Sequence, residues 1–207
     1  METVTYTMTN SSAGAPRSRF LDAAIEAFAE KGFNATTTRD ICSAAGTSPA
    51  ALYVHHKSKE DLLYLISKSG HENTLHAVHE AIASTTDPTA ALHKLIHDFV
   101  ILHASGPAAA RVTNYELAAL TPEHFAEIRD IRHQIEQEVH KLVETGVTSG
   151  AFDTPDPRMA AIALLSLGID IGRWYHEGGR WSPEYLAKRY ADMALRIVGA
   201  SIPIQRS

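Results

Sequence analysis

Residues 36–63 constrain the fold of this 207-residue chain more than any other segment. Their hydrophobic spacing predicts a short helix, a turn at Gly46 and a second short helix over 48–55. Gly46 can adopt the positive φ that ends a helix, while Ser48 can cap the next helix with Pro49 at its first position. Two short helices joined by a tight turn form a helix-turn-helix, whose second helix enters the DNA major groove.

The rest of the chain shows helical periodicity, and no run of alternating β-branched residues indicates a strand. We therefore predict an all-α fold, with a three-helix DNA-binding head over 17–66 and a six-helix effector-binding and dimerisation body over 67–207. Residues 1–16 are rich in Thr, Ser, Asn, Gly and Ala, which predicts a disordered tail. The predicted helices cover about 17–31, 37–44, 48–55, 58–84, 88–104, 108–120, 122–146, 158–177 and 182–199.

Composition and charge permit a DNA-binding protein of the cytoplasm. The single cysteine, Cys42, excludes an internal disulfide and is expected to be a packed small hydrophobe. We expect no membrane partner, because no stretch approaches the ~20 apolar residues of a membrane-spanning helix. The net charge of −5 argues against nucleic acid, but residues 17–68 hold seven Lys and Arg against six Asp and Glu. Such a head can bind DNA if its cations lie at the phosphates.

The second helix of the motif is suited to reach base edges. Pro49 and Ala50 are small, so the backbone can approach the groove, and Arg39 is the best candidate for gripping a guanine. Each of these assignments has a plainer alternative: Tyr53 could pack the core of the head, and Arg39 could pair with a neighbouring aspartate. His55 and Lys59 could be ordinary solvated residues. The residues expected to donate to phosphates are Thr38, Ser48, Tyr53, His55 and Lys59.

This segment resembles the DNA-binding domain of tetracycline-repressor (TetR) type regulators. The resemblance implies phosphate contacts for Tyr53, His55 and Lys59, and it implies a double-stranded operator as the partner. One departure is His56, which stands where the family usually has Phe, and it predicts a rearranged local core. The matching residues are Ala23, Ala24, Phe28, Gly32, Phe33, Thr37, Ile41, Ala45, Gly46, Ser48, Leu52, Tyr53, His55, Lys59, Glu60 and Leu62.

The C-terminal part of the chain is expected to pair two copies into a homodimer on a palindromic site. From Met159 to Gly172 the predicted helix is apolar nearly all round, so one side must face the core and another side a partner. Gly168 and Gly172 lie four residues apart on one face, which would let two helices approach closely. The residues assigned to the dimer interface are Leu164, Gly168, Gly172, Leu186, Tyr190, Met193 and Ile197.

The remaining helices of the body would surround a cavity for a small-molecule effector, because such cavities are mostly apolar with a few polar groups. Any single candidate residue could instead be plain core. Wider candidates are Leu102, Ile128, Arg132 and Ile169. The residues assigned to the effector site are Phe99, His103, Tyr115, Glu116, Arg173 and Trp174.

A second resemblance concerns the effector. The segment 172–187 is similar to a Trp-Tyr-x-x-x-Gly-x-x-Ser-Pro-Glu stretch in TetR members that sense acyl-CoA thioesters, which implies such an effector. An alternative is a repressor that responds to aromatic or cationic drugs, which would bind to Tyr115, Glu116 and Trp174.

The sequence contains twelve histidines, with pairs such as His93 and His97 at helical spacing. A zinc site needs three or four converging ligands, so a metal-dependent protein is the weaker alternative and we expect no metal or other cofactor. A serine hydrolase is a still weaker alternative, since no Gly-x-Ser-x-Gly elbow occurs. The TetR resemblance implies a regulator, so we expect no enzyme. The resulting prediction is a ligand-responsive transcriptional regulator, with repression favoured.

Overall fold

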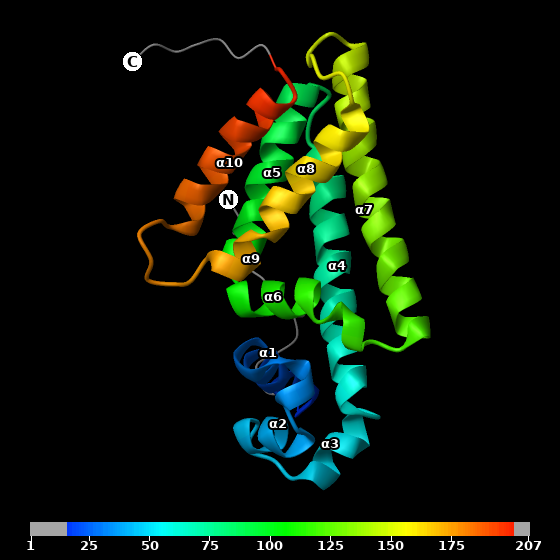
Figure 1. Ribbon diagram of the computed structural model, residues 1–207, viewed down its shortest axis with the longest axis vertical. Helices are drawn as coiled ribbons and strands as arrows, with labels where there is room; N and C mark the ends of the chain where they lie inside the picture. The colour runs from blue at the N-terminus through cyan, green and yellow to red at the C-terminus, as the bar shows by residue number, and fades with distance from the viewer. Residues whose placement is uncertain (1–15, 201–207) are drawn as a thin grey trace.

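The computed structural model describes residues 16–200, and in this part of the chain every regular element is helical. Figure 1 shows the helices α1, α2 and α3 at one end of an elongated molecule, with α4 rising from them through the rest. We call α1–α3 the head and α5–α10 the body. The elements are α1 (Pro16–Ala35), α2 (Thr38–Ala44), α3 (Pro49–His55), α4 (Lys59–Ala83), α5 (Pro88–Ala104), α6 (Pro107–Tyr115), η1 (Leu117–Ala119), α7 (Pro122–Thr148), α8 (Pro157–Ile169), α9 (Ile171–Trp174) and α10 (Pro183–Ile197).

The predicted helix-turn-helix is confirmed, with its local capping. Thr37 and Asp40 form a capping box that begins α2. Gly46 follows α2 with a φ of +64°, which a residue with a side chain rarely adopts. The Ser48 hydroxyl then accepts a hydrogen bond from the Ala51 amide at the start of α3. These local interactions fix the angle between α2 and α3.

The element α1 consists of two helical segments that meet at a kink at Gly32, whose φ of +76° and ψ of 160° are not helical, so the first segment ends where it was predicted to end. The chain then makes one more turn up to Ala35. The buried Thr36 hydroxyl, 2.8 Å from the Gly32 carbonyl and 3.0 Å from the Ala27 carbonyl, fastens this turn to the helix. The helical backbone is therefore interrupted at Gly32, and Thr36 ties the following turn back to the first helical segment.

His56 keeps the buried place that the TetR resemblance gives to Phe. Its side chain is 2% exposed, and its ring meets Phe20 edge-on at 5.9 Å. Its Nδ1 lies 3.4 Å from an Asp61 carboxylate oxygen at the start of α4. The position therefore stays buried in the core of the head, and only the type of side chain differs. An imidazole lies where the family usually has a phenyl ring, and Asp61 is its polar neighbour.

Two hydrophobic clusters hold the molecule together, and α4 belongs to both. The head cluster includes Leu62, Leu63 and Ile66 of α4 together with Ala109 and Val112 of α6. The body cluster is centred on α5, which packs against α10, α4, α7 and α8. The head is therefore built on α4 and α6, and a displacement of either helix would be felt by the head.

The predicted helix over 158–177 is divided in the structure. It breaks at Asp170 into α8 and α9, and from Tyr175 the backbone is extended, with φ −76° and ψ 140°. The extended backbone allows the Tyr175 ring, 7% exposed, to join the body cluster. The predicted helix over 108–120 likewise ends at Tyr115 and continues as the short η1.

The two glycines assigned to a dimer contact pack inside the chain instead. A Cβ added at Gly168 would clash with the Phe99 ring of α5, and one at Gly172 would lie 3.1 Å from Ala110 of α6. Leu164 and Leu186, assigned to the same contact, are only 3% and 5% exposed. The close approach predicted between two copies therefore occurs between helices of one copy, because α8 and α9 turn their glycine face inward.

Candidate functional site

The helix α3 presents an exposed surface at the end of the molecule. Tyr53 is 57% exposed, so it does not pack the core, and the neighbouring Val54 is 79% exposed. Pro49, Ala50 and His55 are exposed as well. Val54 was missed from the sequence, since a β-branched apolar residue in a short helix reads as core. Its methyl groups could contact a thymine methyl in the major groove.

Arg39 of α2 is exposed beside this surface, and Thr38 is partly exposed. The two aspartates considered as partners of Arg39 have other neighbours: Asp40 accepts from Thr37 and lies near Lys31, and Asp61 lies beside His56. Among the described residues neither aspartate pairs with Arg39. Its guanidinium therefore remains a candidate for base or phosphate contact.

Two of the assigned phosphate donors already have partners. The Ser48 oxygen accepts the α3 cap bond, which leaves its hydroxyl hydrogen for a phosphate. The Lys59 ammonium donates to the carbonyls of Phe33 and Thr36, both at 2.7 Å, and lies 4.1 Å from the centre of the Phe33 ring. Burial lowers the pKa of Lys59. With two of three donors engaged, Lys59 closes the end of α1 and keeps one donor for DNA.

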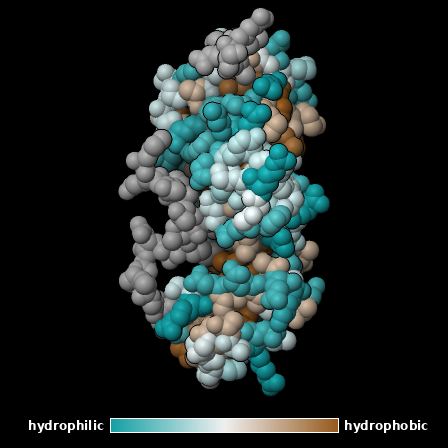
Figure 2. All heavy atoms as spheres, turned by 90° about the vertical axis from the view of Figure 1, so that its left-hand side faces the viewer, coloured by the Kyte–Doolittle hydropathy of each residue, from teal (hydrophilic) through white to brown (hydrophobic). Residues whose placement is uncertain are grey.

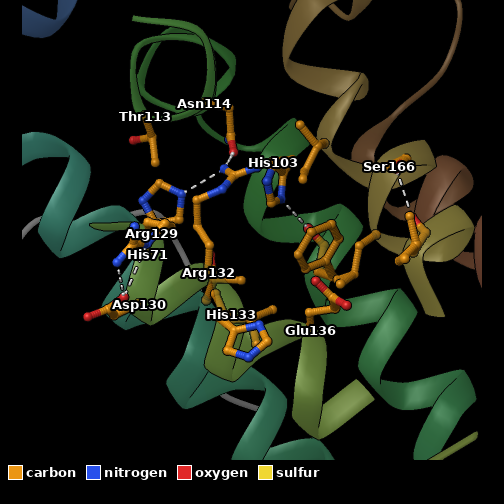
Figure 3. A pocket seen from close by; sticks show the side chains of 16 residues that line it. His71, His103, Thr113, Asn114, Arg129, Asp130, Arg132, His133, Glu136 and Ser166 are labelled. Carbon is orange, nitrogen blue, oxygen red and sulfur yellow. Dashed lines mark hydrogen bonds and ion pairs between the residues drawn. The ribbon is translucent and has the colours of Figure 1, made fainter. Parts of the chain in front are cut away.

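The body contains a cavity of about 620 Å³ whose walls come from α4, α5, α6, α7 and α8. Figure 3 shows polar side chains of these helices converging around the guanidinium of Arg132. This volume suits an organic ligand of ordinary size. The lining residues are His71, Thr74, Phe99, His103, Thr113, Asn114, Arg129, Asp130, Arg132, His133, Ile135, Glu136, Ile162, Leu165, Ser166 and Ile169.

Of the assigned effector residues, Phe99 and His103 line this cavity and the other four do not. Tyr115 and Arg173 both bind the Asp170 carboxylate, at 3.4 and 2.7 Å, near the junction of α8 and α9. Glu116 lies close to Gly32 of the head, and Trp174 packs edge-on against Trp181, with ring centres 6.4 Å apart. The break at Asp170 carries the α9 residues away from the cavity.

The cavity residues missed from the sequence lie chiefly on α7 and α8, with two more on α4 and two on α6. His71 and Thr74 are buried on α4 at a spacing of three residues, so they share one face of that helix. That spacing was a usable signal, because a buried polar pair inside a long helix needs partners. Asn114 was not predictable in the same way, because its orientation depends on where α6 ends.

The two buried histidines of the cavity are neutral acceptors. The Nδ1 atoms of His71 and His103 lie 2.7 and 2.8 Å from the carbonyls of Ser67 and Phe99. A carbonyl only accepts, so each Nδ1 carries the ring proton and each Nε2 presents a lone pair. Burial lowers the pKa of both rings to about 4. Both rings are therefore uncharged at neutral pH.

Apolar side chains remain exposed on the two helices expected to pair copies. On α8 these are Met159 and Leu167, 58% and 46% exposed, and on α10 they are Tyr185, Met193 and Ile197. Figure 2, which looks onto the side where α10 lies, shows hydrophobic residues gathered along its upper right edge. The exposed apolar side chains of α10 include Met193 and Ile197 of the assigned interface, while Tyr190 is half-buried.

The histidine pairs do not assemble a metal site among the described residues, where no group of three potential ligands converges. His93 lies 3.5 Å from Asp192, and His97 lies 3.1 Å from Asp98. Across residues 16–200, no helix is both long enough and apolar enough to span a membrane.

Comparison with known proteins agrees with this arrangement. Residues 20–64 match the family of bacterial regulatory proteins of the tetR type, and residues 85–198 match the tetracyclin repressor-like C-terminal domain. The transcriptional repressor KstR2 of Rhodococcus jostii is 30% identical over 181 residues, which cover 86% of this chain and 89% of KstR2.

Solved structures show the same fold. A tetR-family regulatory protein from Rhodococcus RHA1 has a TM-score of 0.84 and 42% identity, over 92% of this chain and all of the other. AibR, solved in complex with isovaleryl coenzyme A and operator DNA, has a TM-score of 0.79 and 22% identity, over 90% of this chain and all of AibR. The family matches, the helix-turn-helix and the helical body agree: this chain belongs to the tetR family of bacterial regulatory proteins and is a transcriptional regulator, not an enzyme.

Proposed function

We propose that the protein is a cytoplasmic repressor that binds a palindromic operator as a homodimer and leaves it when a small molecule enters the body cavity. In this proposal the DNA-binding domain covers residues 17–66, and residues 67–207 bind the effector and the second copy. The observation that carries the proposal is the course of α4. This one unbroken helix begins next to the head at Lys59, and it presents His71 and Thr74 to the cavity.

The start of α4 is also tied to α7, the helix that contributes Arg132 to the cavity. His124 of α7 lies 2.7 Å from Glu60 and stacks on Tyr64 with ring centres 3.8 Å apart. A further contact joins Lys68 of α4 to Glu127 of α7 at 2.6 Å. A ligand that shifts α7 therefore also displaces the part of α4 that supports the head.

The helix α6 provides a second structural connection between the cavity and the head. Its Asn114 lines the cavity, whereas its Ala109 and Val112 pack in the head cluster. Arg111 of the same helix reaches the Ala29 carbonyl of α1 at 3.5 Å. A ligand need only favour one position of α4 and α6 to change the angle of α3, and a coupling of ~1–3 kcal/mol is typical of such switches.

The exposed apolar residues of α8 and α10 support the pairing of two copies of the chain. Burying Met159, Leu167, Tyr185, Met193 and Ile197 against a second copy would remove their apolar surface from water. Two heads would then bind half-sites separated by about one turn of DNA or more. This compensates for the small positive charge of a single head.

For the effector we propose an acyl-CoA thioester, the class implied by the similarity of residues 172–187. AibR, a protein of the same fold, was solved with isovaleryl coenzyme A and operator DNA. The cavity supplies Phe99, Leu165 and Ile169 for an apolar acyl group. The drug-binding alternative receives no support, because Tyr115, Glu116 and Trp174 lie outside the cavity.

The test begins with an operator selected from random DNA by the purified protein. Its affinity is then measured with and without saturating acyl-CoA, with free CoA as control. We expect the thioester to weaken binding at least fivefold. An operator that is never released by any ligand binding in the cavity would refute the switch and leave the DNA-binding head unaffected.

A further inference from the structure

One residue lining the cavity, Arg132, carries a positive charge with no counter-ion among the described residues. Arg132 of α7 lines the cavity and is partly buried. Among the described residues no carboxylate lies within ion-pair distance of its guanidinium, although the cavity has two acidic residues. Asp130 pairs with Arg129 at 3.1 Å, and Glu136 pairs with Arg158 at 3.4 Å.

Neutral groups hold the guanidinium in place. The Nη1 atom of Arg132 lies 3.1 Å from His71 Nε2 and 3.2 Å from Asn114 Oδ1. Figure 3 shows both contacts. Because the tautomer of His71 is fixed by the Ser67 carbonyl, its Nε2 accepts a hydrogen bond but adds no charge. The site thus orients the cation without neutralising it.

Such a cation is costly to keep from water unless something compensates it. A partly buried charge normally has an opposite charge or several strong acceptors beside it. The guanidinium has five N–H donors in a planar fork that matches a carboxylate, and the contacts above occupy only Nη1. The remaining donors suit an anionic ligand group.

His103 of α5 adds a second requirement for a ligand of the cavity. Its ring is 3% exposed, packs on Phe99 and lines the cavity. Its Nδ1 donates to the Phe99 carbonyl, so Nε2 is an acceptor without a partner among the described residues. Because His103 lines the cavity, this acceptor can receive a hydrogen bond from a hydroxyl or N–H group of a ligand.

We propose that the cavity selects organic carboxylates: the carboxylate binds Arg132, a nearby hydroxyl or N–H donates to His103, and an apolar chain lies along Phe99, Leu165 and Ile169. This rests on the proposed function only in taking the cavity as the effector site. The carboxylate belongs either to a free acid or to the far end of a dicarboxylic acyl-CoA.

The test measures ligand binding to the full-length protein by calorimetry at pH 7.5, without DNA. The probes are 3-hydroxydecanoate, decanoate and decanamide, with glutaryl-CoA against butyryl-CoA as the thioester arm. We expect decanoate to bind at least tenfold more tightly than decanamide, and 3-hydroxydecanoate more tightly than decanoate. Preference for glutaryl-CoA over butyryl-CoA would assign the carboxylate to a thioester, and preference confined to the free acids would assign it to an acid.

Arg132→Gln should abolish the preference for the acid over its amide, while Arg132→Lys should retain part of it because the charge remains. The matched control is Arg129→Gln, which removes an equal charge from the same helix and the same cavity but from an exposed pair. It should leave the preference unchanged. Equal binding of acid and amide, no carboxylate binding, or a preference that survives in Arg132→Gln would overturn the proposal. Operator release is measured separately, so carboxylates that bind without releasing DNA would refute the proposed switch alone.

Discussion

Gly168→Ala tests how α8 packs against α5. A Cβ at this position would lie 2.5 Å from Phe99 Cδ1 and closer still to Cε1, whereas ordinary contact begins at 3.4 Å, so the ring must move by about 1 Å. Phe99 is 3% exposed and cannot swing into solvent. Its free direction is into the cavity that it lines. The substitution should therefore strain the body and narrow the cavity together.

Overpacking of this kind costs ~1–3 kcal/mol. For a chain of this size each kcal/mol lowers the melting temperature by ~2–4 °C, so the expected loss is ~2–12 °C. The assay is thermal unfolding followed by circular dichroism at one fixed protein concentration, because melting of a dimer depends on concentration. The matched control is Ser166→Ala on the same helix, where the exposed hydroxyl bonds only the Ile162 carbonyl; this change should cost less than ~0.5 kcal/mol.

Two results would refute this reasoning. A melting temperature equal to that of the wild type would show that Gly168 does not contact Phe99. The second result is an unchanged melting temperature together with a weaker dimer, where the dimer dissociation constant is measured by sedimentation. That result would place Gly168 at the contact between copies, as the sequence alone suggested.

Three further predictions concern the head and the cavity. Tyr53→Ala should abolish operator binding in a gel shift while leaving the melting temperature within ~1 °C, because the side chain is 57% exposed; unchanged affinity would contradict the assigned contact. Lys59→Met should destabilise the fold by ~2–4 kcal/mol in urea unfolding, because it removes two hydrogen bonds from a charged donor; a loss of DNA affinity alone would contradict this. The free energy of unfolding should fall as the pH drops from 6.5 towards 4, because His71 and His103 become protonated in the unfolded chain while they stay neutral in the folded protein. At pH 5 the loss is ~2 kcal/mol for each ring, and the double variant His71→Gln with His103→Gln should flatten the profile; an unaltered profile would refute it.

The local structure of the head was predictable from sequence because its signals act over a few residues. The cap at Ser48 begins α3 as expected, and side-chain caps at Asp87, Thr121, Asp156 and Ser182 begin helices of the body in the same way. Each cap depends on a side chain and an amide two or three residues away. Packing elsewhere in the chain is not needed to identify such a cap.

The site in the body was predictable only in part, because it depends on how helices cross. Phe99 and His103 face the cavity as expected, since they lie on one face of a helix that packs against several others. The break at Asp170 and the inward turn of Gly168 and Gly172 result from packing against α5 and α6. Nothing in the periodicity of residues 158–177 distinguishes a face toward the core from a face toward a partner.

The most direct test of the account is the operator affinity of the dimer at increasing concentrations of a ligand shown by calorimetry to need Arg132. We expect the dissociation constant for the operator to rise at least fivefold to a plateau, corresponding to a coupling of ~1 kcal/mol or more. We also expect the Arg132→Gln variant to bind the operator normally but to lose its response to the ligand. Equal operator affinity with the cavity filled and empty would contradict the claim that α4 links the cavity to the DNA-binding surface.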